Sequence, residues 1–352
     1  MLDWVKSAAA IREEVDGKTI LITGGTGSWG KKMLHMLLTE FKPAKVIVFS
    51  RDELKQSVMQ EEYYPKYYDT LRFFLGDIRD YDRLCDAFRG VDVLFHAAAL
   101  KQVPALEYNP FEAVKTNILG AHNVIRAARQ CGVKRIVALS TDKAAAPVNL
   151  YGATKLCQDK LMVSANHMYQ GDIMVSVVRY GNVFGSRGSV VPFFLKQKRV
   201  QSKLTITDNR MTRFTISLHE GVCFVLNVLA RMKGGEIWIP KIPSYKITTV
   251  ADAIKNGDDS TEIVETGIRP GEKLHEVMIP MDEAMNALEY EDCYVIGPAG
   301  DVWTNERAEH LEKDGAKQIS DPNFEYSSGT NAQWLSREQL VAQVAAFERN
   351  GP

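Results

Sequence analysis

The sequence lacks paired cysteines, metal-ligand spacings, long apolar runs and any excess of one charge. Its five cysteines form no C-x-x-C pair and its seven histidines no metal-ligand pattern, so we expect neither disulfides nor a metal site. With 43 basic and 44 acidic residues, the chain offers no general attraction for nucleic acid or an anionic membrane. No apolar run approaches the roughly twenty residues that cross a bilayer, and the N-terminus lacks the order of a signal peptide. We therefore predict a cytoplasmic protein.

Strands and helices alternate through the first half of the chain. Short apolar runs that typify buried strands occupy residues 18–23, 45–49, 71–75, 91–95, 133–139 and 173–178. Helical patterns separate them, including one long helix expected over 110–132. This alternation predicts an α/β fold with a doubly wound parallel sheet.

The chain length favours two domains. We expect an N-terminal extension over residues 1–17, the sheet domain over 18–184, and a smaller, mainly substrate-binding domain over 185–352. Some segments of the last part are expected to return to the sheet. Ser336 and Gln339 predict a capping box for a last helix that ends near Phe347.

A glycine-rich turn follows the first predicted strand and precedes a helix. Its glycines, Gly24, Gly27 and Gly30, permit a tight turn, a close approach of the backbone to a pyrophosphate, and close helix packing. Thr26, Ser28 and Trp29 complete the turn. A glycine triplet alone is weak evidence, but its place between a strand and a helix predicts a dinucleotide site.

The second predicted strand ends in Ser50 and Arg51, where an NAD site usually carries an acidic residue. Arg51 can pair with a 2′-phosphate, so NADP is predicted over NAD, although an exposed loop arginine is the plain alternative. The other predicted cofactor contacts are Asp77 at the adenine, Ile78, Ala97, Ala98 and Lys101, with Asn117 expected to bond the backbone of the active-site strand.

Tyr151 and Lys155 stand one helical turn apart, shortly after the buried strand 133–139. A lysine ammonium near a phenol lowers the pKa of the phenol, so Tyr151 is predicted to act as a base near neutral pH. Such a pair alone is commonly a surface feature. The neighbouring strand end, with Thr141, Asp142 and Lys143, and the dinucleotide turn favour a proton-transfer role instead.

The second half of the chain carries dispersed arginines. Arg210, Arg213 and Arg269 suit a diphosphate, although each alone is commonly a surface ion-pair partner. Residues 269–273 are predicted to form a turn into a short helix. The predicted substrate-binding residues are Lys101, Asn182, Arg187, Val190, Thr205, Arg213, Arg269 and Glu272.

Seven sequence blocks resemble the extended short-chain dehydrogenase/reductase superfamily and, within it, the UDP-N-acetylglucosamine 4,6-dehydratases that invert C5. The blocks are SRDELKQS (50–57), HAAALKQVP (96–104), STDKAA with NLYGATK (140–155), RYGNVFGSRGSVVPFF (179–194), ITDNRMTRF (206–214), IRPGEKLHEVMIP (268–280) and FEYSS with QWL (324–335). The resemblance extends from about residue 18 to 335, and it implies a Rossmann-type NADP domain and UDP-N-acetylglucosamine as substrate.

The resemblance also implies a reaction and its residues. Tyr151 takes the C4 hydroxyl proton, assisted by Lys155 and Thr141, while hydride passes to the nicotinamide. Lys143 then removes the C5 proton and Asp142 protonates the departing C6 hydroxyl, which requires the pKa of Lys143 to fall and that of Asp142 to rise. The hydride returns to C6, so NADP is recycled and the product is the 4-keto-6-deoxy L-arabino sugar of pseudaminic acid-type pathways.

Three alternatives stay open from the sequence. A C5-retaining dehydratase needs the same residues, and a UDP-sugar 4-epimerase needs only Tyr151 and Lys155. A non-catalytic NADP-binding regulator, from another functional class, would be expected to have lost a catalytic group. Exposed faces of the 110–132 and 151–169 helices are expected to pair subunits in a homo-oligomer.

Overall fold

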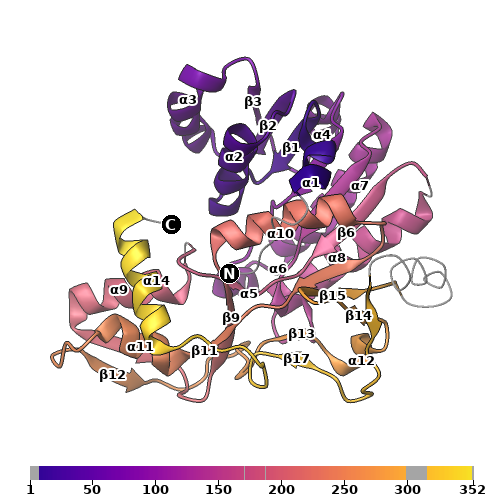
Figure 1. The fold of residues 1–352 in the computed structure, drawn as a ribbon. Coiled ribbons are helices and arrows are strands. Elements are labelled where there is room, and N and C mark those ends of the chain that lie inside the picture. Colours follow the sequence, from indigo (N-terminus) through magenta and orange to yellow (C-terminus); the bar gives the residue numbers. More distant parts are fainter. Residues whose placement is uncertain (1–7, 170, 187, 299–314, 351–352) are drawn as a thin grey trace.

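A ten-stranded sheet organises the chain (Figure 1). The computed structural model describes residues 8–169, 171–186, 188–298 and 315–350. The strand order is β16-β14-β15-β10-β6-β5-β4-β1-β2-β3. Strands from β3 to β10 are parallel, whereas β15, β14 and β16 continue the sheet in antiparallel pairs. The strands are β1 (Thr19–Thr23), β2 (Lys45–Ser50), β3 (Leu71–Leu75), β4 (Val93–His96), β5 (Arg135–Leu139), β6 (Met174–Val178), β10 (Ile237–Pro240), β14 (Ala287–Glu289), β15 (Cys293–Ile296) and β16 (Lys317–Gln318).

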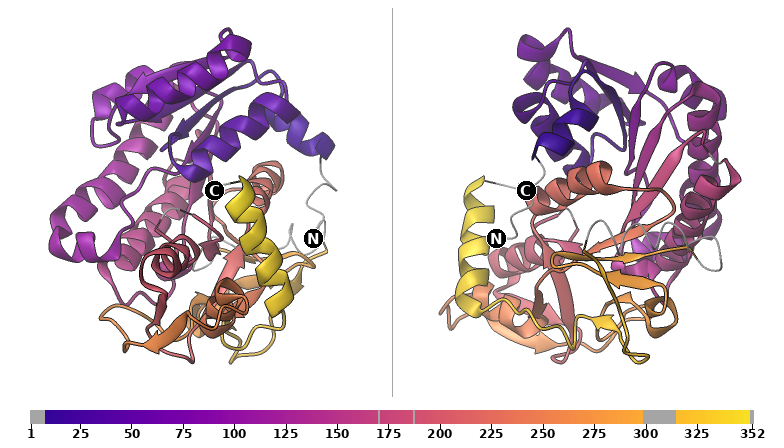
Figure 2. Two further views of the ribbon diagram at one scale, coloured as in Figure 1. Left: turned by 90° about the vertical axis from the view of Figure 1, so that its left-hand side faces the viewer. Right: turned by 45° about the vertical axis from the view of Figure 1, so that its right-hand side comes forward.

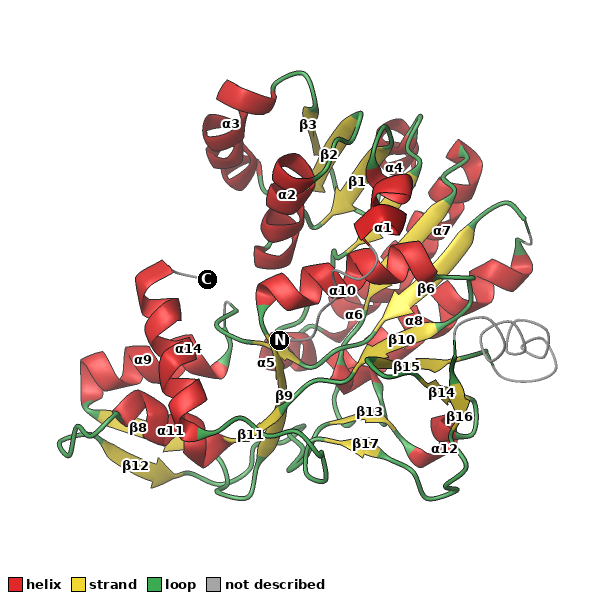
Figure 3. Cartoon of the chain, in the orientation of Figure 1, coloured by secondary structure: helices red, strands yellow, loops and turns green. Residues whose placement is uncertain are grey.

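Helices cover both faces of this sheet, as Figure 3 shows. Helix α10 contacts both α1 and α2, and α7 contacts both α4 and α8 in a second group. The central strands are buried Ile, Leu and Val runs because both of their faces are covered. The predicted doubly wound α/β fold is therefore confirmed. The helices of the sheet are α1 (Ala8–Val15), α2 (Ser28–Glu40), α3 (Glu53–Tyr67), α4 (Tyr81–Phe88), α5 (Val103–Tyr108), α6 (Pro110–Ala113), α7 (Gly120–Cys131), α8 (Leu150–Met168) and α10 (Leu218–Arg231).

A smaller unit with its own core lies beside the carboxyl ends of the parallel strands (Figure 2). Its core includes Phe194, Leu204, Val250 and Leu340, all with little or no exposed surface. Beside the large sheet, the small sheets have the orders β11-β9-β7, β12-β8 and β13-β17, and the buried residues of β13-β17 pack into the core of the large sheet. The elements are β7 (Asn182–Val183), α9 (Val190–Gln201), β8 (Lys203–Ile206), β9 (Thr212–Ile216), β11 (Ser244–Lys246), α11 (Ile247–Lys255), β12 (Glu262–Glu265), β13 (Val277–Ile279), α12 (Met281–Ala284), β17 (Tyr326–Ser327) and α14 (Arg337–Asn350).

Two predicted helices differ in the structure. The helix expected over 110–132 is divided into α6, the π-helix η2 (Val114–Leu119) and α7, and π-turns of this kind are frequent at functional sites. The turn at 269–273 leads through an irregular segment into β13 and not into a short helix, because the chain there pairs with β17. The capping box of Ser336 and Gln339 is confirmed by both of its hydrogen bonds.

The ends of the chain bear on the domain prediction. Of the expected N-terminal extension, α1 packs against α10, and residues 1–7 lie outside the described residues. The boundary at residue 184 stays a prediction, and four strands from beyond it belong to the large sheet. None of the helices in the described ranges has the length and hydropathy needed to cross a bilayer. All five cysteines carry free thiols.

Candidate active site

A cavity of about 1260 Å³ opens at the carboxyl ends of the parallel strands, where open α/β sheets bind ligands. It exceeds the roughly 300–1,000 Å³ of ordinary ligand pockets, as a site for two nucleotides requires. Both halves of the chain contribute to it. The predicted residues on its wall are Gly24, Thr26, Gly27, Ser28, Trp29, Gly30, Ser50, Arg51, Asp77, Ile78, Ala97, Ala98, Lys101, Thr141, Lys143, Tyr151, Lys155, Asn182, Val190, Arg213, Arg269 and Glu272.

The glycine turn fits a dinucleotide. Gly24 has a φ of +68°, and a Cβ there would lie 2.9 Å from the backbone nitrogen of Ala98. A Cβ on Gly30 would lie 2.5 Å from the Cα of Gly25, so only glycine lets α2 pack this closely on the turn. Helix α2 begins at Ser28 with its N-terminus at the cavity, and free backbone N–H groups at such a position suit phosphate.

Arg51 lies at the adenosine end of this predicted site and is not free. Its Nη1 atom lies 3.3 Å from Oδ2 of Asp77, which also accepts from the Arg79 guanidinium at 2.7 Å. Burial opposes the charge of Asp77, but these arginine contacts hold the pKa of its carboxyl below the ordinary value. A 2′-phosphate would therefore compete with Asp77 for Arg51.

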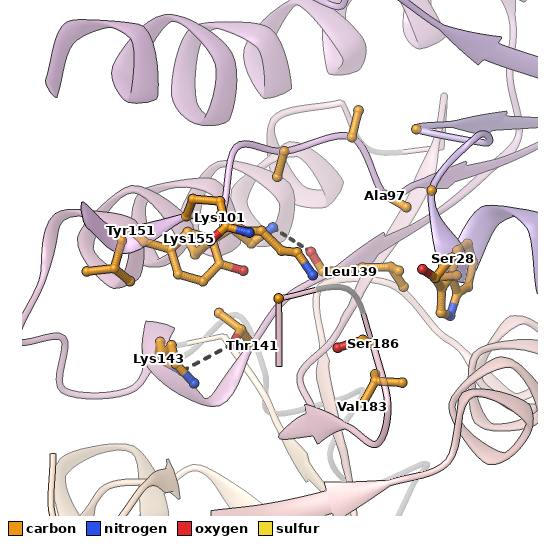
Figure 4. Close-up of a pocket in the computed structure, with 18 of the residues that line it drawn as sticks. Ser28, Ala97, Lys101, Leu139, Thr141, Lys143, Tyr151, Lys155, Val183 and Ser186 are labelled. Carbon is orange, nitrogen blue, oxygen red and sulfur yellow. Dashed lines mark hydrogen bonds between the residues drawn. The ribbon is translucent and has the colours of Figure 1, made fainter. Parts of the chain in front are cut away.

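Helix α8 places Tyr151 and Lys155 on the cavity wall (Figure 4). The Asn149 side chain caps the helix by accepting from the Gly152 N–H at 2.8 Å, and its amide donates to the carbonyl of Gly271. A Cβ on Gly152 would lie 2.1 Å from the Lys143 carbonyl oxygen. Glycine at this position therefore lets the turn that carries Lys143 pack directly against the start of α8.

Lys155 points to the end of strand β5. Its Nζ donates to the carbonyl oxygen of Leu139 and to Oε1 of Gln158, both at 2.6 Å. The side chain is almost fully buried, and burial lowers the pKa of Lys155 to about 8, opposed by the carboxylate of Asp159. The prediction that Lys155 lowers the pKa of Tyr151 is wrong for this geometry. Burial raises the pKa of Tyr151 to about 12, with Lys143 as the cation that opposes it.

Thr141 and Lys143 lie below the Tyr151 helix in Figure 4. Thr141 caps the 3₁₀ turn η3 (Asp142–Ala144), which contains Asp142 and Lys143. Oδ1 of Asp142 accepts from the Thr141 hydroxyl at 2.8 Å and from Lys143 Nζ at 3.0 Å. Asp142 itself has no exposed surface and does not line the cavity, and its Oδ2 has no hydrogen-bond partner among the described residues. Burial raises the pKa of Asp142, the direction expected of an acid.

Lys143 contacts a second carboxylate that the sequence interpretation missed. Its Nζ lies 3.4 Å from Oε1 of Glu276, and Asn182 Oδ1 accepts from it at 3.3 Å. Burial would lower the pKa of the ammonium, but Asp142 and Glu276 outweigh it and raise the pKa of Lys143. The expected fall of this pKa is therefore wrong for the free protein. Glu276 stands in the IRPGEKLHEVMIP block, but its spacing carries no signal that it meets Lys143.

Other predicted residues lie elsewhere. Asn117 bonds both main-chain groups of Leu100 and the Thr154 hydroxyl, so it fixes the loop after β4. It does not bond the backbone of β5, contrary to the sequence prediction, and it does not line the cavity. Thr205 bonds Gln197 away from the cavity because its strand pairs with β12. Arg210 is held by Asp208 and faces a second cavity. Arg187 lies outside the described residues.

The comparisons with known proteins agree with this geometry. A family model described as polysaccharide biosynthesis protein matches residues 20–298. A UDP-N-acetylglucosamine 4,6-dehydratase (inverting) from Campylobacter jejuni is 53% identical over 329 residues, 93% of this chain and 97% of the relative. A UDP-glucose 4-epimerase from Rickettsia conorii is 42% identical over 285 residues, 79% of this chain and 82% of the relative.

Among solved structures, the X-ray structure of Pen from Bacillus thuringiensis superposes with a TM-score of 0.83 at 37% identity, covering 94% of this chain and 99% of that one. The predicted resemblance is thus confirmed over nearly the whole chain. The protein belongs to the polysaccharide biosynthesis protein family and, within it, to the inverting UDP-N-acetylglucosamine 4,6-dehydratases.

Proposed function

We propose that this protein dehydrates UDP-N-acetylglucosamine across C5 and C6 with inversion at C5, as a lyase that recycles a bound nicotinamide dinucleotide. One observation carries the proposal. Tyr151, Lys155 and Lys143 line one cavity, with Asp142 bonded to Lys143 behind its wall, so that oxidation at C4 and elimination at C5 and C6 can follow each other there. The product is the 4-keto-6-deoxy sugar of the L-arabino series.

The first step oxidises C4, because the C5 proton becomes acidic only beside a carbonyl. When bound, the nicotinamide accepts and later returns the hydride. Tyr151 takes the C4 hydroxyl proton as a phenolate. Burial raises the pKa of Tyr151 to about 12 in the free protein, so its phenolic proton has to leave after the ligands bind and before this transfer. Lys155, fixed on Leu139, is positioned to bind the nicotinamide ribose, and the Thr141 hydroxyl to bond the C4 oxygen.

The second step eliminates water. Lys143, on the cavity wall, acts as the base at C5 once it has lost its proton. Asp142 supplies the proton for the C6 hydroxyl, and burial favours its protonated form. Because Asp142 is enclosed, its proton can reach the cavity only through the groups that bond Oδ1, namely Thr141 and Lys143. Asp142 and Lys143 therefore act as one unit in the elimination.

NADP is proposed over NAD because Arg51 lies on the cavity wall where a 2′-phosphate would sit. For the UDP diphosphate we propose Arg213 and Arg269. Arg269 is exposed and paired with Glu272 at the rim, whereas Arg213 is mostly buried. Lys101, Asn182 and Val190 line the remaining sugar and nucleotide space.

The setting of the reaction is also proposed. A 4-keto-6-deoxy L-sugar suits a pathway to pseudaminic acid-type sugars in the cytoplasm. Phe111, Leu119 and Met168 are exposed apolar side chains on the helices expected to pair subunits, which supports a homo-oligomer. Light scattering tests this, and a monomer at micromolar concentration would contradict it.

A UDP-sugar 4-epimerase is the second candidate because of the 42% identity to the Rickettsia relative. The geometry favours dehydration. An epimerase needs only the tyrosine and lysine of α8, whereas here a buried acid and a lysine are bonded to each other beside that pair.

The test is to incubate the purified protein with UDP-N-acetylglucosamine in deuterated water and follow the sugar by proton NMR. We expect a 6-deoxy-4-keto product with deuterium at C5 and the ring couplings of the L-arabino sugar. Ring couplings of the D-xylo sugar would establish the retaining reaction. Inversion of the configuration at C4, with no loss of water, would establish the epimerase.

A further inference from the structure

Glu276 is a nearly buried carboxylate on the cavity wall, contributed by the smaller unit. It is 4% exposed and precedes β13. Its backbone N–H donates to the Ser328 hydroxyl at 2.9 Å, and its carbonyl accepts from the Ser328 N–H at 2.8 Å. The position of its side chain is therefore fixed by the main chain on both sides.

One oxygen of Glu276 is shared by two cations. Oε1 lies 3.4 Å from Lys143 Nζ and 3.6 Å from Arg213 Nε. Oε2 is buried with no hydrogen-bond partner among the described residues. A buried carboxylate left partly unbonded costs free energy, so a purely structural role gives no reason for it to stand at the cavity. Its nearest reactive neighbour is the proposed base.

We infer that Glu276 is a positioning residue of the dehydration: its carboxylate holds the Lys143 ammonium and sets the pH at which Lys143 becomes the free amine that acts at C5. The inference rests on the proposed function. Arg213 shares the same oxygen, so a substrate diphosphate bound to Arg213 would weaken its hold on Glu276. Substrate binding and the protonation of Lys143 are thereby coupled through one carboxylate.

The sign of the expected effect follows from the charges around Lys143. Removing the Glu276 charge lowers the pKa of Lys143, because an ammonium loses a nearby anion. It also lowers the pKa of Asp142, which Glu276 raises by repulsion. The titratable and charged groups facing Lys143 are Lys101, Asp142, Tyr151, Arg213, Tyr245, Lys273 and Glu276.

The first measurement is the pH profile of kcat for Glu276→Gln, which keeps the size of the side chain and removes its charge. The acid limb reports the lower, and the alkaline limb the higher, of the two coupled ionisations of Asp142 and Lys143. We expect both limbs to move to lower pH, by about one unit for a partly screened charge at this distance. Glu276→Asp keeps the charge and should move both limbs back toward the wild-type positions.

The second measurement needs no turnover. The rate of Lys143 acetylation by acetic anhydride, followed across pH by peptide mass spectrometry, gives the titration midpoint of the amine. We expect it to fall by about one unit in Glu276→Gln. The matched control is Glu289→Gln, which breaks a lysine–carboxylate pair with Lys241 outside the cavity and should leave the midpoint unchanged.

The outcomes separate the two proposals. A lower rate in Glu276→Gln with unmoved limbs and an unmoved labelling midpoint would mean a merely structural role and would overturn the inference. Failure of the wild-type protein to form any dehydrated sugar would overturn the proposed function instead, whatever the labelling shows.

Discussion

The Nζ atom of Lys155 lies 2.6 Å from the main-chain oxygen of Leu139, which ties helix α8 to the end of strand β5. The tie holds an ammonium in a place where burial disfavours charge, and the pKa of Lys155 falls to about 8. Charge on Lys155 is therefore costly, and the proposed role of this lysine at the nicotinamide ribose gives a reason for its presence.

The first prediction concerns the stability contributed by Lys155. Its folded pKa of about 8 lies below the ordinary 10.5, so between these values the unfolded chain binds a proton that the folded chain lacks. The free energy of unfolding attributable to Lys155 should therefore rise with pH between about 8 and 10.5. The difference in urea midpoint between the wild type and Lys155→Met, measured at pH 7 and pH 10, checks this.

At pH 7 we expect Lys155→Met to be at least as stable as the wild type, because the Gln158 amide still donates to the Leu139 carbonyl. Its kcat should fall by about a hundredfold or more. A variant that is equally inactive but clearly less stable at pH 7 would argue that the lysine is mainly structural.

The second prediction separates the two chemical steps. Asp142→Asn preserves the shape of a neutral acid but cannot release a proton, so C4 oxidation should persist while elimination fails. The reduced cofactor should accumulate on mixing with substrate, seen as absorbance at 340 nm, and 6-deoxy product should drop about a hundredfold or more. Tyr151→Phe serves as the comparison, since it should abolish both signals. Absence of the 340 nm signal in Asp142→Asn would place Asp142 in the first step.

The third prediction concerns cofactor choice. Arg51→Ala should weaken NADP binding about tenfold and leave NAD binding nearly unchanged, because only NADP carries the 2′-phosphate. The effect is modest because the Arg51 side chain is half exposed and already paired with Asp77. Fluorescence titration with each dinucleotide measures it. Arg89→Ala, an exposed arginine paired with Asp86 off the cavity, is the control. Equal weakening of both cofactors would remove the basis for proposing NADP.

The fourth prediction tests the link between α8 and the C-terminal segments. Arg179 is fully buried, and its guanidinium contacts Asp159 at 3.4 Å, Glu283 at 2.6 Å and the Met278 carbonyl at 2.9 Å. Arg179→Met leaves Asp159 without its ion-pair partner and Glu283 with only the exposed Lys160, and it should lower the free energy of unfolding by about 3–5 kcal/mol.

Urea denaturation measures the change at Arg179, with Arg199→Met as the matched control. Arg199 makes an exposed pair with Glu348, so its loss should cost less than about 1 kcal/mol. Similar losses of unfolding free energy in both variants would show that the buried ion pairs of Arg179 stabilise the fold no more than an exposed pair does.

The first half of the chain was predictable because its signals are local. The glycine turn, the strand ends and the Tyr151 spacing depend on neighbours in sequence, and all lie where the pattern placed them. The π-helix η2 was not predictable from the apolar pattern, and neither were the bonds that Asn117 within it makes to Leu100.

Charge chemistry was harder to predict than position. The protonation of Lys143 depends on Glu276, which lies 133 positions along the chain and reaches the site only because β13 pairs with β17. The pKa of Tyr151 depends on burial, which no spacing reports. These pKa values follow from tertiary contacts between residues far apart in the sequence. Local sequence patterns therefore do not predict them.

The place of β10 in the large sheet has a consequence for how this protein is made and handled. A chain leaves the ribosome N-terminus first, and strand β6 has no neighbour on one side until residues 237–240 follow it. Until then its edge offers unpaired N–H and carbonyl groups to any other nascent chain. A recombinant fragment ending at residue 184 would carry that bare edge permanently. Such a fragment is expected to aggregate and not to behave as a small dinucleotide-binding protein. Recombinant work with this protein therefore has to keep residues 237–240.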